Sequence, residues 1–545
     1  MEKQSVCSKI AGGPSTLYYN GTILTMDDEC PAVQAVLVSG GRIRARGSEE
    51  ELMAQKDEDT ICIDLAGRTM LPGFIDGHSH FSGLATSLSQ CDLSGASDFE
   101  DIVALLRAFI RENSVPKGQW VVGVNYDHNF LSEKRHPDKT VLDRVSGVHP
   151  VVIVHASSHM GVANSAGLAV QGIAQETADP QGGRYGRTES GEPDGYMEEN
   201  AFVQFRSRMP MPDIDEIMKL FLRAQEVYAS YGITTVQEGM VTPPLYQLLQ
   251  YARQKDLFYL DLAGYADLEH CDQMPGLQQE NPACYRGHLK IGGYKIFLDG
   301  SPQGRTAWML EPYKGAQDGY RGYPVKTDEQ VYALILRALE DNRQILAHCN
   351  GDAAAQQYIT QFEKVCREHP EYAPNRPVMV HAQLVREEQL ERMKALFMMP
   401  SFFVAHTYYW GDIHIQNFGM ERAGRISPAG TTLRLGIPFT FHQDSPVLPP
   451  DVFQTIWCAA KRVTKNGVQL AEGEQISVYD ALRAMTVYGA YQYGEECDKG
   501  MIREGKLADL IITDRNPLEV PADEVKQIRV LETIKEGCSI YKREA

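Results

Sequence analysis

Two patterns of apolar and polar positions divide the chain into regions with different expected structures. Near both ends, short segments alternate apolar and polar residues between Gly, Asn and Asp, as in "AVLVSGGRIRARG" and "GMIREGKLADLIITDRNP". This alternation is typical of half-buried β-strands joined by turns. Because the termini of a domain often lie close together, we predict that residues 1–70 and 496–545 form one composite β-sandwich domain.

Between these ends, apolar runs alternate with amphipathic helical stretches such as "DIDEIMKLFLRAQEVYASYG" and "TDEQVYALILRALEDN". Strands are predicted at residues 74–80, 232–238, 260–266, 292–299, 344–348, 377–381, 397–403 and 437–444. Strands that alternate with helices form parallel sheets, which makes the fold class α/β. Eight such strands predict a parallel (β/α)8 TIM-like barrel within residues 71–495.

The interval between the first two predicted strands is too long for a simple crossover. It contains further strand-like runs at "WVVGVNYD" and "PVVIVHAS", and a long Pro- and Gly-rich loop at "DPQGGRYGRTESGEPDGY". We therefore predict a large insertion after the first barrel strand, at about residues 85–225, that acts as a lid or substrate wall.

Composition and charge restrict the class of protein. Of 545 residues, 43% are hydrophobic and 23% are charged, which is typical of a soluble globular protein. The formal net charge of −19 argues against a nucleic-acid partner. The sequence shows no apolar stretch of membrane-spanning length, no signal-like apolar region at its start, and no CxxC pair among its 11 cysteines. We therefore expect a cytoplasmic protein with a small-molecule substrate and no nucleic-acid or membrane partner.

Residues that can bind metal occur in or at the ends of five predicted barrel strands. His78 and His80 belong to the first strand, where side chains at i and i+2 point the same way. Taken alone, such an HxH pair is more often structural than metal-binding. The later strands contribute Lys295, His348, His381 and Asp444. Because the carboxyl ends of barrel strands meet at one mouth, we expect these six side chains to converge there.

The chemistry of these six residues indicates a metal site. Neutral imidazole and carboxylate bind Zn²⁺, and they also accept Mn²⁺, Fe²⁺ or Co²⁺. Burial lowers the pKa of a lysine, and a neutral Lys295 can take up carbon dioxide as a carbamate that bridges two metals. Two metals roughly 3.5–4 Å apart can share a hydroxide and polarise a carbonyl. Asp444 can bind one of them, accept a proton from the attacking water and deliver it to the leaving amine.

Seven motifs follow one another in a recognisable order: "NGTILTMD", "LPGFIDGHSH", "GGYKIFLDGSPQGRTA", "AHCNGDAA", "VHAQL", "DSPVLPPD" and "GMIREGKLADLIITDRNP". Together they resemble the amidohydrolase superfamily over nearly the whole chain, and more specifically its amidohydrolase-3 branch, which includes N-substituted formamide deformylases. The resemblance implies that His78 and His80 hold the more buried metal. It implies that His348 and His381 hold the other, with N6-carboxylated Lys295 as a bridge between two Zn²⁺ ions. Asp444 would be ligand and general base, although some members of the superfamily keep a single metal.

Further residues are candidates for substrate binding. His406, Tyr408 and Trp410 follow the seventh strand in "VAHTYYWGD", where they are either packing residues or the wall of an apolar pocket. His159 in the insertion is a candidate for orienting the scissile carbonyl. Arg305, after the lysine strand, is a candidate for binding a polar group of the substrate.

His442 departs from the pattern of the branch, which usually has Gly-Ser before the aspartate. Here the aspartate is preceded by His442 and Gln443, so an additional imidazole lies two residues before Asp444. It is either a hydrogen-bond partner of the site or a residue that selects the substrate.

The leading hypothesis is a metal-dependent hydrolase that cleaves an amide-type C–N bond of an N-acyl or N-formyl amine. A metal-bound hydroxide would attack, with Asp444 as general base and acid. A lactonase or esterase would use the same site, as would a cyclic amidine deaminase, but deaminases of this superfamily tend to lack a bridging lysine. A non-catalytic metal-containing binding protein would be expected to lack a ligand or the general base, and all six residues are present. A homodimer is a further expectation that no sequence pattern supports.

Overall fold

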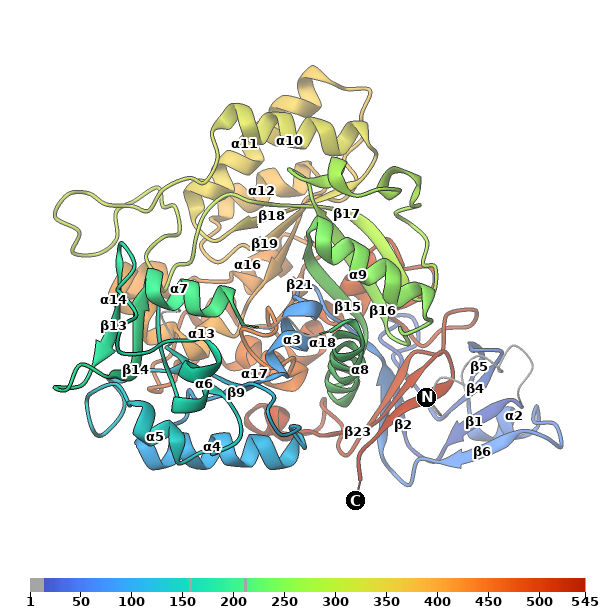
Figure 1. Cartoon of the computed structure of the whole chain (residues 1–545). Coiled ribbons are helices and arrows are strands. Elements are labelled where there is room, and N and C mark those ends of the chain that lie inside the picture. Colours follow the sequence, from blue (N-terminus) through green and yellow to red (C-terminus); the bar gives the residue numbers. More distant parts are fainter. Residues whose placement is uncertain (1–13, 156–158, 210–212, 545) are drawn as a thin grey trace. The chain divides into compact units, whose positions relative to one another are not determined.

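The computed structural model describes residues 14–155, 159–209 and 213–544 (Figure 1). Residues 1–13 of the predicted N-terminal segment lie outside the described residues. The chain divides into two compact units, one made of Met1–Gly83 and Leu222–Ala545 and the other of Leu84–Phe221. Among the described helices, none has the length and apolar character that spanning a membrane requires.

The first unit contains an eight-stranded parallel sheet in which each strand pairs with the next along the chain. Its strands are β8 (Phe74–Ile75), β15 (Ile233–Val241), β16 (Asp261–Asp267), β17 (Leu289–Phe297), β18 (Gln344–Cys349), β19 (Val378–His381), β20 (Met399–Phe402) and β21 (Thr440–Phe441). A Cβ added to Gly77, just after β8, would lie 2.6 Å from Thr440 Oγ1 and 2.8 Å from the carbonyl oxygen of Phe441. The two edges of the sheet therefore lie against each other, as in the predicted TIM-like barrel.

Amphipathic helices connect the barrel strands. The predicted helix at "TDEQVYALILRALEDN" is α10 (Asp328–Glu340), which begins with a capping box between Thr327 and Gln330 and buries Val331, Ile335, Ala338 and Leu339 on one face. The other predicted helix is α8 (Ile214–Ser230), which precedes β15. Later connections contain α9 (Pro243–Gln254), α11 (Asp352–Glu368), α12 (Glu387–Ala395) and α16 (Ala429–Arg434), and α17 (Val452–Lys461), α18 (Val478–Ala484) and α19 (Val487–Gln492) follow β21.

Strands from both ends of the chain join in one six-stranded sheet. Its order is β24 (Cys538–Lys542), β23 (Val530–Lys535), β22 (Leu510–Thr513), β7 (Thr69–Pro72), β2 (Thr22–Leu24) and β3 (Ala32–Val33). A four-stranded sheet contains β5 (Arg42–Gly47), β4 (Ala35–Ser39), β1 (Thr16–Tyr19) and β6 (Ile61–Asp64). One buried cluster combines Val36 and Val38 of the smaller sheet with Ile512 and Ile534 of the larger. The two sheets therefore share a core.

The Leu84–Phe221 unit has a six-stranded sheet of order β13-β14-β12-β11-β10-β9. The strands are β9 (Gln90–Asp92), β10 (Val121–Tyr126), β11 (Val151–His155), β12 (Met160–Ala163), β13 (Gly183–Arg187) and β14 (Pro193–Glu199). Strands β9, β10 and β11 are parallel, and the other pairs are antiparallel. Helices α4 (Phe99–Glu112) and α5 (Lys139–Asp143) contribute to one buried cluster, and α6 (Ser165–Val170) and α7 (Asn200–Ser207) contribute to a second.

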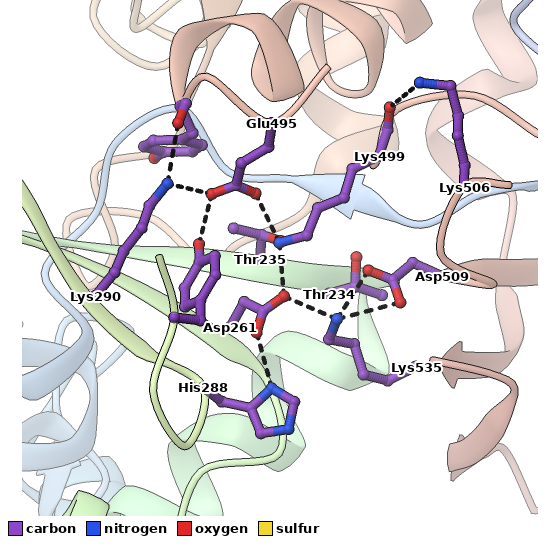
Figure 2. A network of polar contacts seen from close by, with 12 residues as sticks. Thr234, Thr235, Asp261, His288, Lys290, Glu495, Lys499, Lys506, Asp509 and Lys535 are labelled. Carbon is purple, nitrogen blue, oxygen red and sulfur yellow. Dashed lines mark hydrogen bonds and ion pairs between the residues drawn. The ribbon is translucent and has the colours of Figure 1, made fainter. Parts of the chain in front are cut away.

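A buried network of charges joins the amino ends of barrel strands to the C-terminal segment (Figure 2). Asp261, the first residue of β16, lies 2.6 Å from Lys499 Nζ and 2.8 Å from Lys535 Nζ, and it accepts a hydrogen bond from His288 at 2.8 Å. Glu495 pairs with Lys499 at 2.7 Å and also with Lys290 near the start of β17. Breaking a buried ion pair leaves an uncompensated charge, so this network fixes the C-terminal segment to the barrel.

Candidate metal centre

The six predicted ligands lie at the carboxyl ends of the barrel strands or just beyond them. Strand β8 ends at Ile75, so His78 and His80 follow the strand rather than alternate within it. The predicted reason for their convergence, a shared strand face, is therefore wrong. The backbone of His80 forms an isolated β-bridge with Glu238 of β15. The ring centroids of His78 and His80 lie 5.2 Å apart.

His78, His80 and Asp444 direct their polar atoms at one point. The Nε2 atoms of His78 and His80 lie 3.5 and 3.4 Å from Asp444 Oδ1. That buried oxygen has no hydrogen-bond partner among the described residues. Although burial raises the pKa of Asp444, the neighbouring histidines hold it well below its usual range, so this carboxylate is ionised. A carboxylate whose buried oxygen faces two imidazole nitrogens without a hydrogen bond is suited to a divalent cation.

Lys295 lies beside these residues in the interior of the barrel. It belongs to β17, between β16 and β18, and its side chain is fully buried. Its Nζ lies 3.2 Å from His78 Nε2, and no ion pair to it is formed by any described residue. Burial lowers the pKa of Lys295 to about 7. Lys295 therefore lies in a central strand of the sheet, with its side chain shielded from water.

His348 of β18 and His381 of β19 form the other side of the cluster. Their ring centroids lie 4.6 Å apart, and the ring of His381 lies 5.7 Å from that of His78. The buried Nδ1 of His348 has no hydrogen-bond partner among the described residues and lies 3.2 Å from an oxygen of Asp299. All six predicted residues thus belong to one connected group of side chains.

Two of these residues have an unusual backbone. His381 has φ of +71° and Asp444 has φ of +54°, in the left-handed region that residues other than glycine rarely adopt. Such strain costs of order 1–3 kcal/mol and is kept where the surrounding structure requires it. The closed barrel thus holds His381 and Asp444 in this conformation next to the other clustered side chains.

Residues of β15 orient the first histidine pair, and the sequence interpretation missed them. Gln237 Oε1 lies 2.5 Å from His78 Nδ1, while Gln237 Nε2 donates to the carbonyl oxygen of Gly77 at 3.1 Å. Glu238 accepts a hydrogen bond from the backbone N–H of Ser82 at 2.7 Å. Because Gln237 occupies Nδ1 of His78, Nε2 is left to face the site. The available signal was that Gln237 and Glu238 are buried polar residues within a barrel strand, β15.

His442 bonds to a predicted ligand from within the core. It is fully buried, its Nε2 lies 3.1 Å from His381 Nδ1, and its Nδ1 lies 3.0 Å from Ser401 Oγ. Both nitrogens of His442 are therefore engaged, and Nε2 of His381 is left for the site. This geometry favours the hydrogen-bonding alternative for His442 over the substrate-selecting one.

Aromatic residues continue from this cluster. The ring of Phe403 lies 5.3 Å from His442 and 4.6 Å from His406. His406 is buried, shares a contact of 3.0 Å with His414 Nε2, and lies 4.5 Å from the ring of Trp410. The rings of Phe403, His406 and Trp410 thus pack together next to His442, with Phe403 and His406 buried and Trp410 partly exposed.

The other candidate substrate residues have different surroundings. The ring of Tyr408 packs against Trp457 at 5.2 Å. The guanidinium of Arg305 lies 5.1 Å above the ring of Tyr313. His159 belongs to the Leu84–Phe221 unit, where its Nδ1 lies 3.1 Å from Glu199 Oε2. In these contacts, the three residues pair with side chains outside the group of six predicted ligands.

Comparison with known proteins identifies the family and the fold. The chain is 28% identical to the N-substituted formamide deformylase of Arthrobacter pascens, over 96% of this chain and 98% of that protein. An uncharacterised metal-dependent hydrolase from Pyrococcus furiosus has a similar structure, with a TM-score of 0.74 and 25% identity over 93% of this chain and all of that one. A similar hydrolase from Pyrococcus horikoshii OT3 has a TM-score of 0.75 at 24% identity, over 93% of this chain and 99% of that one. A family model described as "Amidohydrolase family" matches residues 62–541, and the chain therefore belongs to the amidohydrolase family of hydrolases that act on carbon–nitrogen bonds.

Proposed function

We propose that this protein hydrolyses the amide-type C–N bond of a small N-acyl or N-formyl amine, with a divalent metal centre and with Asp444 as general base and acid. The observation that carries the proposal is the convergence of His78 Nε2 and His80 Nε2 on Asp444 Oδ1, a buried oxygen without a hydrogen bond among the described residues. It occurs at the carboxyl ends of barrel strands, where enzymes of this architecture place their active sites.

The residues present suit two divalent ions. His78, His80 and Asp444 would hold one, and His348 and His381 the other, with Lys295 between them. Burying an ammonium without a counter-charge is costly, which favours a neutral or carboxylated Lys295. Imidazole and carboxylate fit Zn²⁺ as well as Mn²⁺, Fe²⁺ or Co²⁺. When bound, such ions supply Lewis acidity, which polarises a carbonyl and makes water more acidic.

Side chains of this protein transfer the proton and orient the predicted ligands. Asp444 is ionised because the neighbouring histidines lower its pKa, so it can accept a proton from the attacking water. The same carboxyl group delivers this proton to the nitrogen of the leaving amine. Gln237 and His442 bond to the far nitrogens of His78 and His381, and thereby fix the direction of both rings.

The surroundings favour a substrate with an apolar or aromatic substituent. The rings of Phe403, His406 and Trp410 pack together next to His442, and the partly exposed Trp410 is the one of the three that can contact such a substituent directly. The relative from Arthrobacter pascens acts on N-substituted formamides, which belong to the same class of amide. His159, Arg305 and Tyr408 remain predicted substrate contacts on the basis of sequence alone.

Esters and lactones are the second candidate class, because the same site can polarise their carbonyl. A panel that contains an N-benzyl formamide, an N-acetyl amino acid and a γ-lactone, tested with metal-replete enzyme, separates these classes. We expect the highest kcat/KM for the formamide. Preference for the lactone would replace the amide proposal by the lactonase alternative.

The role of Asp444 is tested with Asp444→Asn against Asp59→Asn, which alters an exposed carboxylate. General acid–base catalysis contributes about 10²–10⁴-fold, so we expect kcat to fall by that factor in Asp444→Asn only. Full activity of a folded, metal-containing Asp444→Asn protein would contradict the proton transfer.

The domain division is also proposed. The shared core of the two terminal sheets supports a β-sandwich made from residues 1–70 and 496–545. The barrel would then span residues 71–495, with the insertion at about residues 85–225. A homodimer remains a prediction.

A further inference from the structure

Outside the barrel, the Leu84–Phe221 unit has a cluster of histidines at the ends of two parallel strands. Asp127 and His128 directly follow β10, and His155 is the last residue of β11. Tyr126 and His155 are register partners across these strands, so the three polar side chains start from adjacent points. In open α/β sheets, ligands bind beyond the carboxyl ends of parallel strands.

The polar atoms of these three side chains have the spacing of metal ligands. His155 Nε2 lies 3.3 Å from His128 Nδ1 and 3.4 Å from Asp127 Oδ1, and His128 Nδ1 lies 3.7 Å from the same oxygen. Ligand atoms about 2.0–2.1 Å from a tetrahedral zinc ion are separated by about 3.3 Å. The six clustered side chains of the barrel, which we call the barrel centre, have a similar spacing. There, His80 Nε2 and His78 Nε2 lie 3.4 and 3.5 Å from Asp444 Oδ1.

Neighbouring groups hold these side chains in place. Asp127 Oδ1 accepts hydrogen bonds from the backbone N–H and the side-chain amide of Asn129, both at 2.9 Å. His155 is buried, whereas the imidazole of His128 is 28% exposed. These hydrogen bonds fix the orientation of the Asp127 carboxylate, and the exposed side of His128 offers an entry path for an ion.

A third imidazole, that of His136, lies beside the two histidines. The ring of His136 lies 4.0 Å from that of His128, and its Nδ1 lies 3.1 Å from Tyr126 Oη. The ring of His155 lies 5.3 Å from that of His128 and 5.7 Å from that of His136, so three imidazoles lie beside one another. Imidazole and carboxylate are both ligands of divalent transition-metal ions.

We propose that Asp127, His128 and His155 form a further binding site for a divalent transition-metal ion such as Zn²⁺, with ligands other than those of the barrel centre. Three protein ligands leave a coordination position for water or for an oxygen or nitrogen donor of a small molecule. The alternative is a hydrogen-bonded histidine cluster that binds no metal. The contact of 3.3 Å between His128 and His155 is longer than the usual 2.9–3.0 Å of an N–H donor, which favours the metal.

The test counts zinc ions in the full-length protein by mass spectrometry after chelation and reloading. A His78→Asn/His80→Asn background weakens the barrel centre, and the change in zinc content when a further substitution is added to it reports on the insertion. Adding His155→Gln should remove about one equivalent per chain, and adding His270→Gln, which alters an exposed imidazole in the other unit, should remove none. Loading with Co²⁺ gives a second readout, because visible absorption should decrease with His155→Gln alone.

Equal zinc content in folded His155→Gln and His270→Gln proteins would overturn the proposal. If the buried His155→Gln substitution prevents folding, His128→Gln replaces it, because that imidazole is partly exposed. Since hydrolase activity is not the readout, failure of the barrel proposal would leave this result interpretable. Conversely, a hydrolase with an active barrel and no insertion zinc would refute this inference alone.

Discussion

Gly239 is the position at which one added methyl group should most directly disturb the barrel centre. A Cβ there would lie 2.4 Å from His78 Cε1 and 3.0 Å from His78 Nδ1, whereas ordinary contact begins at 3.4 Å. The backbone of Gly239 cannot easily retreat, because its N–H donates to the carbonyl oxygen of Ser79 at 2.7 Å. In Gly239→Ala the imidazole of His78 therefore has to move away from its bond with Gln237.

The added methyl group should affect stability less than it affects activity. Overpacking a buried site costs about 1–3 kcal/mol, which a domain with about 5–15 kcal/mol of stability tolerates. A displacement of about 1 Å in a catalytic arrangement can cost about 100-fold in rate. We expect folded Gly239→Ala protein with less bound metal and a kcat/KM about 100-fold below that of the natural enzyme.

The assay compares metal content, kcat/KM and thermal unfolding of Gly239→Ala with those of Gly473→Ala. A Cβ at Gly473 meets no atom within 4 Å, so this matched variant controls for the loss of a glycine. If both variants are folded and bind and hydrolyse equally, His78 is not a ligand held in the position described here.

Three further changes test other parts of the structure. His442→Phe removes the partner of His381 Nδ1 and should weaken metal binding about 10–100-fold, measured by competition with a chelator; unchanged affinity would contradict an orienting role. Lys295→Ala should lose metal from the barrel centre, whereas metal analysis that shows the full complement would exclude the lysine as a bridge. Asp261→Asn leaves Lys499 and Lys535 without their shared partner and should lower the free energy of unfolding at pH 7 by about 3–5 kcal/mol in urea titrations. Burial raises the pKa of Asp261, but these lysines lower it further, so the folded pKa lies well below the unfolded value of about 3.9. The stability that Asp261 contributes is therefore present above a pH of about 3.9 and is lost as the pH falls through the folded pKa. A stability difference between Asp261→Asn and the natural protein that persists unchanged in acid would contradict this.

The barrel was predictable because its signals are local. Each of the eight apolar runs became a strand, and the helix predicted within "TDEQVYALILRALEDN" begins directly after Thr327. The limits of strands were less predictable. The first run was predicted to continue to His80, but the strand ends at Ile75, and the chain then passes so close to Thr440 that only glycine fits at position 77. This proximity depends on closure of the sheet, which no local pattern contains.

Local patterns in the sequence were enough to predict the order of elements, the residue types of the barrel centre and their positions at or near strand ends. These follow from periodicity and from the shared direction of parallel strands. Which atoms face one another became visible in the folded chain: Gln237 lies against His78, His442 between His381 and Ser401, and Asp127 beside two histidines of the insertion. The physical reason is that hydrogen bonds and metal ligation require distances within a few tenths of an ångström between residues far apart in sequence, and packing of the whole fold sets those distances.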